Sequence, residues 1–226
     1  MKSISRILAF ALIAAVATPT FAQTKREDLV VQAESCEAIL QEFMGNPKTS
    51  IPASVLREAK GIVIVNQFQF GLVFGGKGGY GVVLARKPNG QWSVPAFLDT
   101  GEASFGLQLG GRTLHTIYIL NDESGVRLLY RAKFNFGVNA NAVAGPRVAQ
   151  AEESTQIIKS PIYVYQKSNG LYAGAKLKSG WLSPHNSANA LFYNTTHTMP
   201  EILFSDWITA PSEVVPLINY VTRLTQ

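Results

Sequence analysis

The chain has 226 residues, of which 46% are hydrophobic, and its formal net charge at pH 7 is +5. This length and composition can bury one ordinary core, and no Pro/Ser-rich linker or block of charge divides the chain. With Cys36 as its single cysteine, the chain forms no intramolecular disulfide, so burial alone must hold the fold. A free cysteine on an apolar stripe is predicted to be a buried structural thiol.

The first residues have the order of a secretory signal. Lys2 and Arg6 precede an apolar run over residues 7–17, which is shorter than the roughly 20 residues of a bilayer span. The small-residue pattern Thr20-Phe21-Ala22 then predicts cleavage after Ala22. We therefore expect a signal peptide over residues 1–22 and a single domain over 23–226, in the periplasm or secreted. Gln23, rather than a cysteine, follows the cleavage site, so no lipid anchor is expected there.

The positive charge is concentrated in the middle of the chain. Residues 57–147 hold ten Lys+Arg and five Asp+Glu, whereas residues 148–226 hold five of each. An anionic partner would therefore be attracted to the middle segment. No later apolar run reaches transmembrane length, so contact with a membrane is predicted to be peripheral.

The domain is predicted to begin with an amphipathic helix over residues 24–44. Its apolar residues recur at alternating spacings of four and three; they are Leu29, Ala33, Cys36, Leu40 and Phe43. Gly45-Asn46-Pro47 ends this helix. Pro52 favours a second, short helix that runs to about Ala59.

A glycine-rich β region follows, because twelve of the nineteen glycines lie between Gly61 and Gly111. The β-branched run over residues 62–65 predicts a buried strand. Lys87-Pro88-Asn89-Gly90 predicts the turn of a hairpin between strands at 80–86 and 91–98, and further strand structure is expected over 103–120. Glycines in such strands permit sharp bends and close approach of neighbouring backbones.

The rest of the chain mixes short helices and strands. Residues 122–131 are predicted to form a helix capped by Asn121 or Asp122, followed by a strand at 133–138. A bend is expected at Gly145-Pro146, and Ser168-Asn169-Gly170 predicts a hairpin turn between strands at 162–165 and 171–175.

Helices are expected at 186–193, capped by Asn186 or Ser187, and at 211–224. The predicted fold class is therefore α+β: a Gly-rich, mostly antiparallel twisted sheet or partial barrel, with an N-terminal amphipathic helix and short C-terminal helices.

Two nucleotide-binding motifs match the glycine-rich stretch, but neither is followed by the residue or element that nucleotide binding needs. Gly71, Gly76 and Lys77 have P-loop spacing, but Gly78 follows where the P-loop needs a Ser or Thr hydroxyl. Gly76, Gly78 and Gly81 match a dinucleotide fingerprint, yet a strand rather than a helix follows. Lys77, between glycines that leave backbone N–H groups open, is instead a candidate anion-binding residue.

Catalytic and metal-binding patterns are weak. The histidines His115, His185 and His197 lack metal-ligand spacing, so no metal and no cofactor are expected. Asp99 and Glu102 flank a Thr-Gly sequence that could place two carboxylates in one turn, but nothing nearby would raise the pKa of either. The chain is therefore interpreted as a binding protein rather than an enzyme.

Several segments, in order over about residues 50–205, resemble the SYLF-domain family. They are Ile51-Pro52, Ala59-Lys60-Gly61-Ile62, Gly75-Gly76-Lys77-Gly78-Gly79-Tyr80-Gly81, Gly90-Gln91-Trp92-Ser93-Val94-Pro95-Ala96, Gly106-Leu107-Gln108-Leu109-Gly110, Ala144-Gly145-Pro146, Ser168-Asn169-Gly170-Leu171-Tyr172-Ala173-Gly174, Asn189 and Phe192-Tyr193. The resemblance implies a lipid-binding domain, with phosphoinositide recognition in eukaryotic members and actin binding in yeast ones. For a secreted chain, we expect the transferable property to be recognition of an anionic phospholipid, with neither actin nor nucleic acid as a partner.

The N-terminal helix departs from the basic, membrane-inserting helix of lipid-binding eukaryotic members. It carries acids that anionic headgroups would repel: Glu27, Asp28, Glu34, Glu37 and Glu42.

The leading hypothesis is a non-catalytic periplasmic or envelope protein that docks peripherally on anionic lipid headgroups. The candidate headgroup-binding residues are the basic residues of the central region: Lys60, Lys77, Arg112, Arg131, Lys133 and Arg147. Three or four of them on one face would suffice for weak, salt-sensitive docking. A structural or assembly protein that binds other envelope proteins is the alternative, and a hydrolase acting on envelope material comes third.

Overall fold

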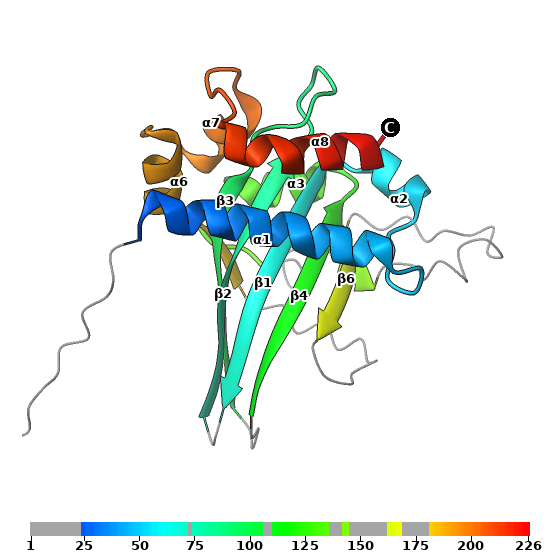
Figure 1. Ribbon diagram of the computed structural model, residues 1–226, viewed down its shortest axis with the longest axis vertical. Helices are drawn as coiled ribbons and strands as arrows, with labels where there is room; N and C mark the ends of the chain where they lie inside the picture. The colour runs from blue at the N-terminus through cyan, green and yellow to red at the C-terminus, as the bar shows by residue number, and fades with distance from the viewer. Residues whose placement is uncertain (1–23, 72–73, 106–109, 136–141, 145–161, 169–180) are drawn as a thin grey trace, which may run out of the picture.

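The computed structural model describes residues 24–71, 74–105, 110–135, 142–144, 162–168 and 181–226 (Figure 1). Five sequence-based predictions lie wholly or mostly outside these residues: the signal peptide, the Gly145-Pro146 bend, Arg147 as a site residue, the Ser168-Asn169-Gly170 turn and the strand at 171–175.

One seven-stranded sheet forms the centre of the fold, in the order β5-β6-β4-β1-β2-β3-β7. The strands are β1 (Gly61–Gly71), β2 (Phe74–Ala85), β3 (Ala96–Phe105), β4 (Gly110–Leu120), β5 (Ala142–Ala144), β6 (Ile162–Ser168) and β7 (Trp181–Pro184). All neighbouring strands are antiparallel except β5 and β6. The predicted α+β class is confirmed, and over the described residues the sheet is open.

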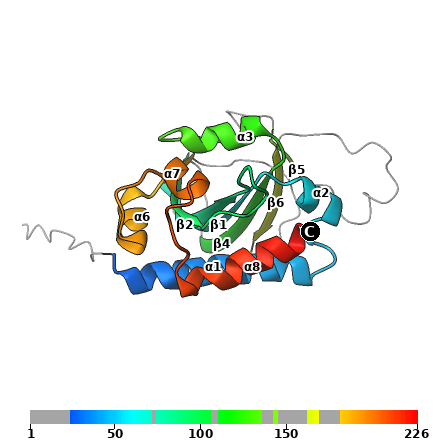
Figure 2. The same cartoon turned by 90° about the horizontal axis from the view of Figure 1, so that it is seen from above.

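The helices are short except for the first. They are α1 (Arg26–Gly45), α2 (Ala53–Glu58), α3 (Glu123–Arg127), α6 (Asn186–Tyr193), α7 (Met199–Phe204) and α8 (Val215–Leu224), with 3-10 turns η1 (Leu128–Tyr130) and η2 (Ser212–Val214). Seen from above, α1 and α8 lie side by side on one side of the sheet and α3 lies on the other (Figure 2).

Alternation along the strands divides the core into two clusters, one on each face of the sheet. Ile62 and Ile64 pack with α1, α6 and α8, whereas Val63 and Val65 pack with η1, α7 and Phe134. The predicted buried strand at 62–65 is therefore confirmed, since all four side chains are at most 1% exposed.

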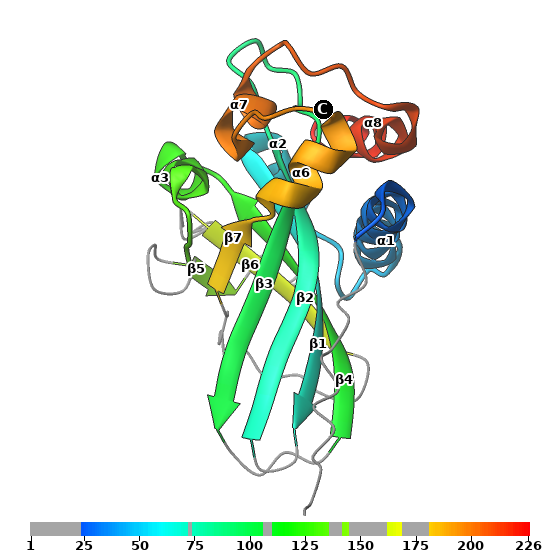
Figure 3. The same cartoon turned by 90° about the vertical axis from the view of Figure 1, so that its left-hand side faces the viewer.

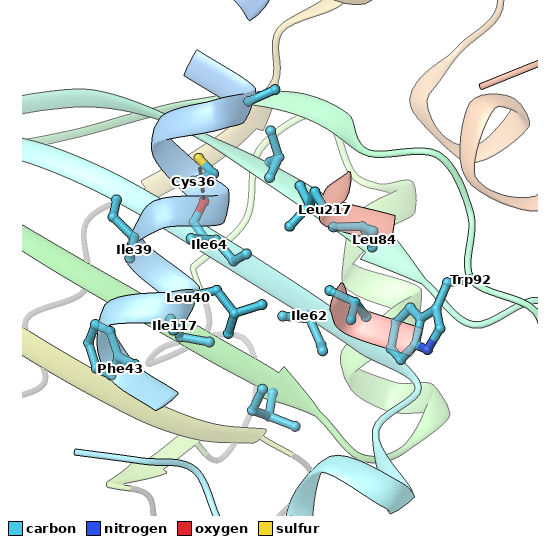
Figure 4. Packing of buried hydrophobic residues seen from close by; sticks show 14 of the residues in the cluster. Cys36, Ile39, Leu40, Phe43, Ile62, Ile64, Leu84, Trp92, Ile117 and Leu217 are labelled. Atoms are coloured by element: carbon cyan, nitrogen blue, oxygen red, sulfur yellow. Dashed lines mark hydrogen bonds between the residues drawn. The ribbon is translucent and has the colours of Figure 1, made fainter. Parts of the chain in front are cut away.

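The predicted stripe of α1 is the side that packs against the sheet (Figure 4). Leu29, Cys36 and Leu40 are fully buried, and Phe43 is 1% exposed. Burying a large apolar side chain contributes about 1.5–3 kcal/mol, so this stripe is what holds α1 in place. The Asp28 carboxylate accepts a hydrogen bond from the Lys25 backbone N–H at 2.9 Å, at the start of the helix.

The predicted hairpin at 80–98 is correct in kind, but its strands are displaced. A turn forms at Lys87 to Gly90, where Gly90 has a φ of +85°, and the Lys87 N–H donates to the Gln91 carbonyl. Residues 91–95 nevertheless precede β3 rather than belonging to it, with only Trp92 bridging to Arg86.

Three further details differ from the sequence predictions. His185, not Asn186 or Ser187, is the N-cap residue of α6. In place of the predicted strand at 133–138, Phe134 forms an isolated bridge with Leu182, and residues 136–138 lie outside the described part of the chain. Helix α7 was not predicted, although Thr198 and Glu201 form its capping box.

Candidate functional site

The described helices cover only one half of the sheet along the strand direction. Before Asn66 on β1, Ile62 and Ile64 are buried under α1, whereas Phe68 is 53% exposed. We call the part of the four central strands beyond Asn66 the far half of the sheet: residues 67–71, 74–79, 100–105 and 110–114. Figures 1 and 3 show the helices gathered at the opposite end of the strands. On the α1 face of the far half, Phe68 is therefore exposed, whereas on the opposite face Gln67 and Thr100 are 5% exposed and Leu114 is 6% exposed.

Polar contacts hold α1 to the sheet along the edge of the far half. The Tyr80 hydroxyl donates to Ser35 Oγ at 3.1 Å, and Asn66 Nδ2 donates to the Tyr80 hydroxyl at 3.0 Å. Farther along α1, Glu42 contacts both His115, at 3.3 Å, and Lys167. The hydrogen bond from Lys167, supported by His115, lowers the pKa of Glu42.

Glu42 was expected to repel anionic headgroups. In the structure, Glu42 forms an ion pair with Lys167 and also contacts His115.

Lys77 and Arg112 occupy one register row of the far half. Lys77 on β2 and Arg112 on β4 both pair with Gln69 of β1, which lies between them. With neighbouring strands about 4.8 Å apart, their Cα atoms are separated by about 10 Å. Glu102 on β3 occupies the register position on the other side of Lys77. Two of the predicted basic residues are thus brought together from positions 35 residues apart in the sequence.

The other candidates do not all join this row. Lys60 immediately precedes β1, nine residues before Gln69, which places it roughly 30 Å away at about 3.3 Å per residue. Arg131 is exposed just after η1. Lys133 is also exposed, and its Nζ lies 4.4 Å from the centroid of the Trp181 ring. The six predicted residues therefore do not form one continuous basic face.

Two glycines of the motif segment have a structural role in β2. A Cβ on Gly79 would lie 2.1 Å from the Asn66 carbonyl oxygen, and one on Gly81 would lie 2.5 Å from that of Ile64. The predicted close approach of neighbouring backbones is confirmed at these two positions. The motif glycines Gly76, Gly78 and Gly81 all lie within β2, so no helix N-terminus follows them.

The proposed carboxylate turn is wrong, because Asp99 and Glu102 lie on the continuous strand β3. Asp99 instead pairs with His185, whose Nδ1 is 3.1 Å from Oδ1. Burial raises the pKa of Asp99, and the nearby His185 opposes that shift. Sequence reasoning missed this pair, since no local spacing connects β3 with the cap of α6.

Two other reactive residue types have structural partners. Cys36 is fully buried, and burial raises the pKa of its thiol to about 12. His197 Nδ1 lies 3.9 Å from Glu201 within the same segment. In the described residues, no group of three His, Cys, Asp or Glu side chains could hold a metal ion. Nor does any described helix have the length and apolarity to cross a bilayer.

A shallow groove of about 460 Å³ lies between α1 and α8. Its lining residues are Glu37, Ser212, Val215, Pro216, Asn219 and Arg223, and more of the lining surface is apolar than polar. This groove does not distinguish the candidate functions.

Comparison with known proteins places the chain in a family. The Ysc84 model, described as "Las17-binding protein actin regulator", matches residues 101–224, more than half of the chain. "SH3 domain-containing YSC84-like protein 1" of Bos taurus is 30% identical over 206 residues, covering 88% of this chain and 60% of that protein. "Protein YSC84" of Saccharomyces cerevisiae is 32% identical over 173 residues, covering 75% of this chain and 37% of that protein.

The chain therefore belongs to the Ysc84 family, and its resemblance to SYLF-domain proteins is confirmed. It spans about 60% of the length of the YSC84-like relatives that it matches. Because the family description names an actin regulator, the expectation that actin is not a partner has no support from these matches.

Proposed function

We propose that the chain is a non-catalytic module of the bacterial periplasm or envelope that docks on anionic phospholipid headgroups. The observation that carries this proposal is the register row of the far half, in which Lys77 and Arg112 stand on either side of Gln69. The row lies in the far half, beyond the described helices, on the face of the sheet opposite α1. Headgroup phosphates would meet two cationic positions about 10 Å apart.

The ion pairs formed by other basic residues also favour docking through the far half. Several basic residues nearer the helices already have partners: Arg26 pairs with Glu213 at 2.7 Å and Lys87 with Asp206 at 2.7 Å. Lys167 likewise pairs with Glu42. These three basic residues are therefore less available to an anionic surface. A basic residue near an anionic surface contributes roughly 1 kcal/mol, so docking is predicted to be weak and sensitive to salt.

Co-sedimentation with vesicles of phosphatidylglycerol and phosphatidylcholine tests this proposal. Binding should require the anionic lipid and should fall as salt rises from low to physiological concentration. Binding to pure phosphatidylcholine vesicles of equal strength, or binding independent of salt, would refute headgroup recognition.

The alternative is a structural or assembly protein that binds another protein. It is favoured by the family description and by Trp207, which is 71% exposed. Co-sedimentation with filamentous actin tests the partner that the family description suggests. Binding to actin without binding to anionic vesicles would favour this alternative.

A further inference from the structure

The far half has an open notch next to Gly78. It lies on the face of the sheet that α1 covers at the other end of the strands. Phe68 shares this side with Ile62 and Ile64, because residues at even steps along a strand face the same way. In register, Phe68 on β1 pairs with Gly78 on β2, and Gly78 pairs with Gly101 on β3. A Cβ on Gly78 would have no atom within 4 Å, so the surface above this residue is open.

Aromatic side chains stand on both sides of the notch. On one side, Phe68 is 53% exposed. On the other, Trp181 of β7 folds over Gly101, where a Cβ would lie 2.5 Å from Cζ2 of the indole. The Cα atoms of Phe68 and Gly101 are two strands apart, or about 10 Å, which leaves a slot about one strand wide. The described walls of this slot are the aromatic side chains of Phe68 and Trp181, and its floor is the glycine Gly78.

A cation lies at the rim of this slot. Lys133 is exposed, and its Nζ is 4.4 Å from the centroid of the Trp181 ring. No acidic side chain of the described residues forms an ion pair with it. On the same face of β3 as Gly101, Asp99 lies two residues earlier and already pairs with His185 at 3.1 Å. Apolar walls with a cationic rim match an anionic amphiphile.

We propose that this slot, formed by Phe68, Gly78 and Trp181 with Lys133 at its rim, holds one acyl chain of an anionic phospholipid. The ammonium of Lys133 then meets the phosphate, while the chain lies over Gly78 between the two aromatic rings. The identity of the ligand rests on the proposed function, but the residues differ from Lys77 and Arg112. Headgroup docking and chain capture are therefore separable.

Filling the notch is the sharpest perturbation. Gly78→Leu removes no side-chain contact, places its Cβ in open space, and requires no left-handed backbone. This variant should keep the thermal melt of the wild type while binding a short-chain lysophosphatidate, used below its critical micelle concentration, at least tenfold more weakly. Lys133→Gln should weaken binding of this probe about fivefold but leave binding of the phosphocholine analogue with the same chain unchanged.

Tryptophan fluorescence locates the bound chain. In a Trp207→Phe background, the remaining tryptophans are Trp181 and the buried Trp92. A probe with a brominated acyl chain should quench the emission, and Gly78→Leu should abolish that quenching. If Gly78→Leu binds the probe as well as the wild type does, or if the probe does not quench the tryptophan emission, the proposed slot is wrong.

Vesicle binding separates this inference from the proposed function. If the slot fails these tests while anionic vesicles still bind, only the slot is wrong. If the monomeric probe binds in the slot while anionic vesicles do not bind, the slot stands and surface docking is wrong.

Discussion

Alanine substitutions at two adjacent glycines of β2, Gly78 and Gly79, should change the stability of the fold in opposite directions. A Cβ on Gly79 would lie 2.1 Å from the Asn66 carbonyl oxygen and 2.8 Å from the Gln67 Cα, both backbone atoms that cannot rotate away. Gln67 also reaches across Gly79 in register and donates to Thr100 Oγ1 at 2.7 Å. Gly79→Ala should therefore destabilise the fold by about 2–4 kcal/mol, through overpacking and a weakened buried hydrogen bond.

Gly78→Ala is the matched control, because its Cβ would enter open space. Alanine restricts the unfolded chain more than glycine does, so this variant should be more stable than the wild type by about 0.4–1 kcal/mol. The two variants should thus differ by about 2–5 kcal/mol in the free energy of unfolding, or roughly 10 °C in Tm for a domain of this size. Urea denaturation followed by circular dichroism measures this difference. Equal stability of the two variants would refute the close approach of β1 and β2 at Gly79.

Three further outcomes follow from the same contacts. The hydrogen bond from Arg26 lowers the pKa of Glu213 to about 2 from its ordinary 4.5. A lowered pKa stabilises the fold above pH 4.5, and this stability is lost as the pH falls toward 2. In acid titrations, Glu213→Gln should therefore lose less stability than the wild type between pH 4.5 and pH 2. The buried Cys36 thiol, with its pKa raised to about 12, should react with a thiol reagent only after unfolding, and rapid reaction of the folded protein would contradict its burial. Thr225→Val removes the acceptor of the buried Trp92 indole N–H, which is 2.9 Å away, and should cost about 1–3 kcal/mol in thermal or chemical unfolding.

Local periodicity was sufficient to predict α1 and the buried first part of β1. The stripe of α1 has a single helical repeat, and the β-branched residues 62–65 allow little besides a buried strand. The extension of β1 to Gly71 was missed, although the alternation of Gln67, Phe68, Gln69 and Phe70 is typical of a strand with two different faces. Helix α7 was also missed despite a capping box that the sequence contains.

The candidate site was predictable only in part, because it depends on strand register. The sequence identified Lys77 and Arg112 as cationic, but only the pairing of β2 and β4 with β1 places them on either side of Gln69. The same pairing separates Lys60 from them by the length of the strand. The slot depends on Gly78, Gly101 and Trp181, which come from three strands and share no sequence pattern.

The most direct test of the proposed function compares two double variants with the same loss of charge. Lys77→Ala with Arg112→Ala removes the two cations of the far half, whereas Arg57→Ala with Lys60→Ala removes two exposed cations at the helix-covered end. In vesicle co-sedimentation with phosphatidylglycerol, the first variant should bind about 25-fold more weakly, at roughly 1 kcal/mol per residue, and the second should bind nearly as well as the wild type. Equal losses in both variants would show that net charge alone drives binding, and full binding by the first would contradict docking through the far half.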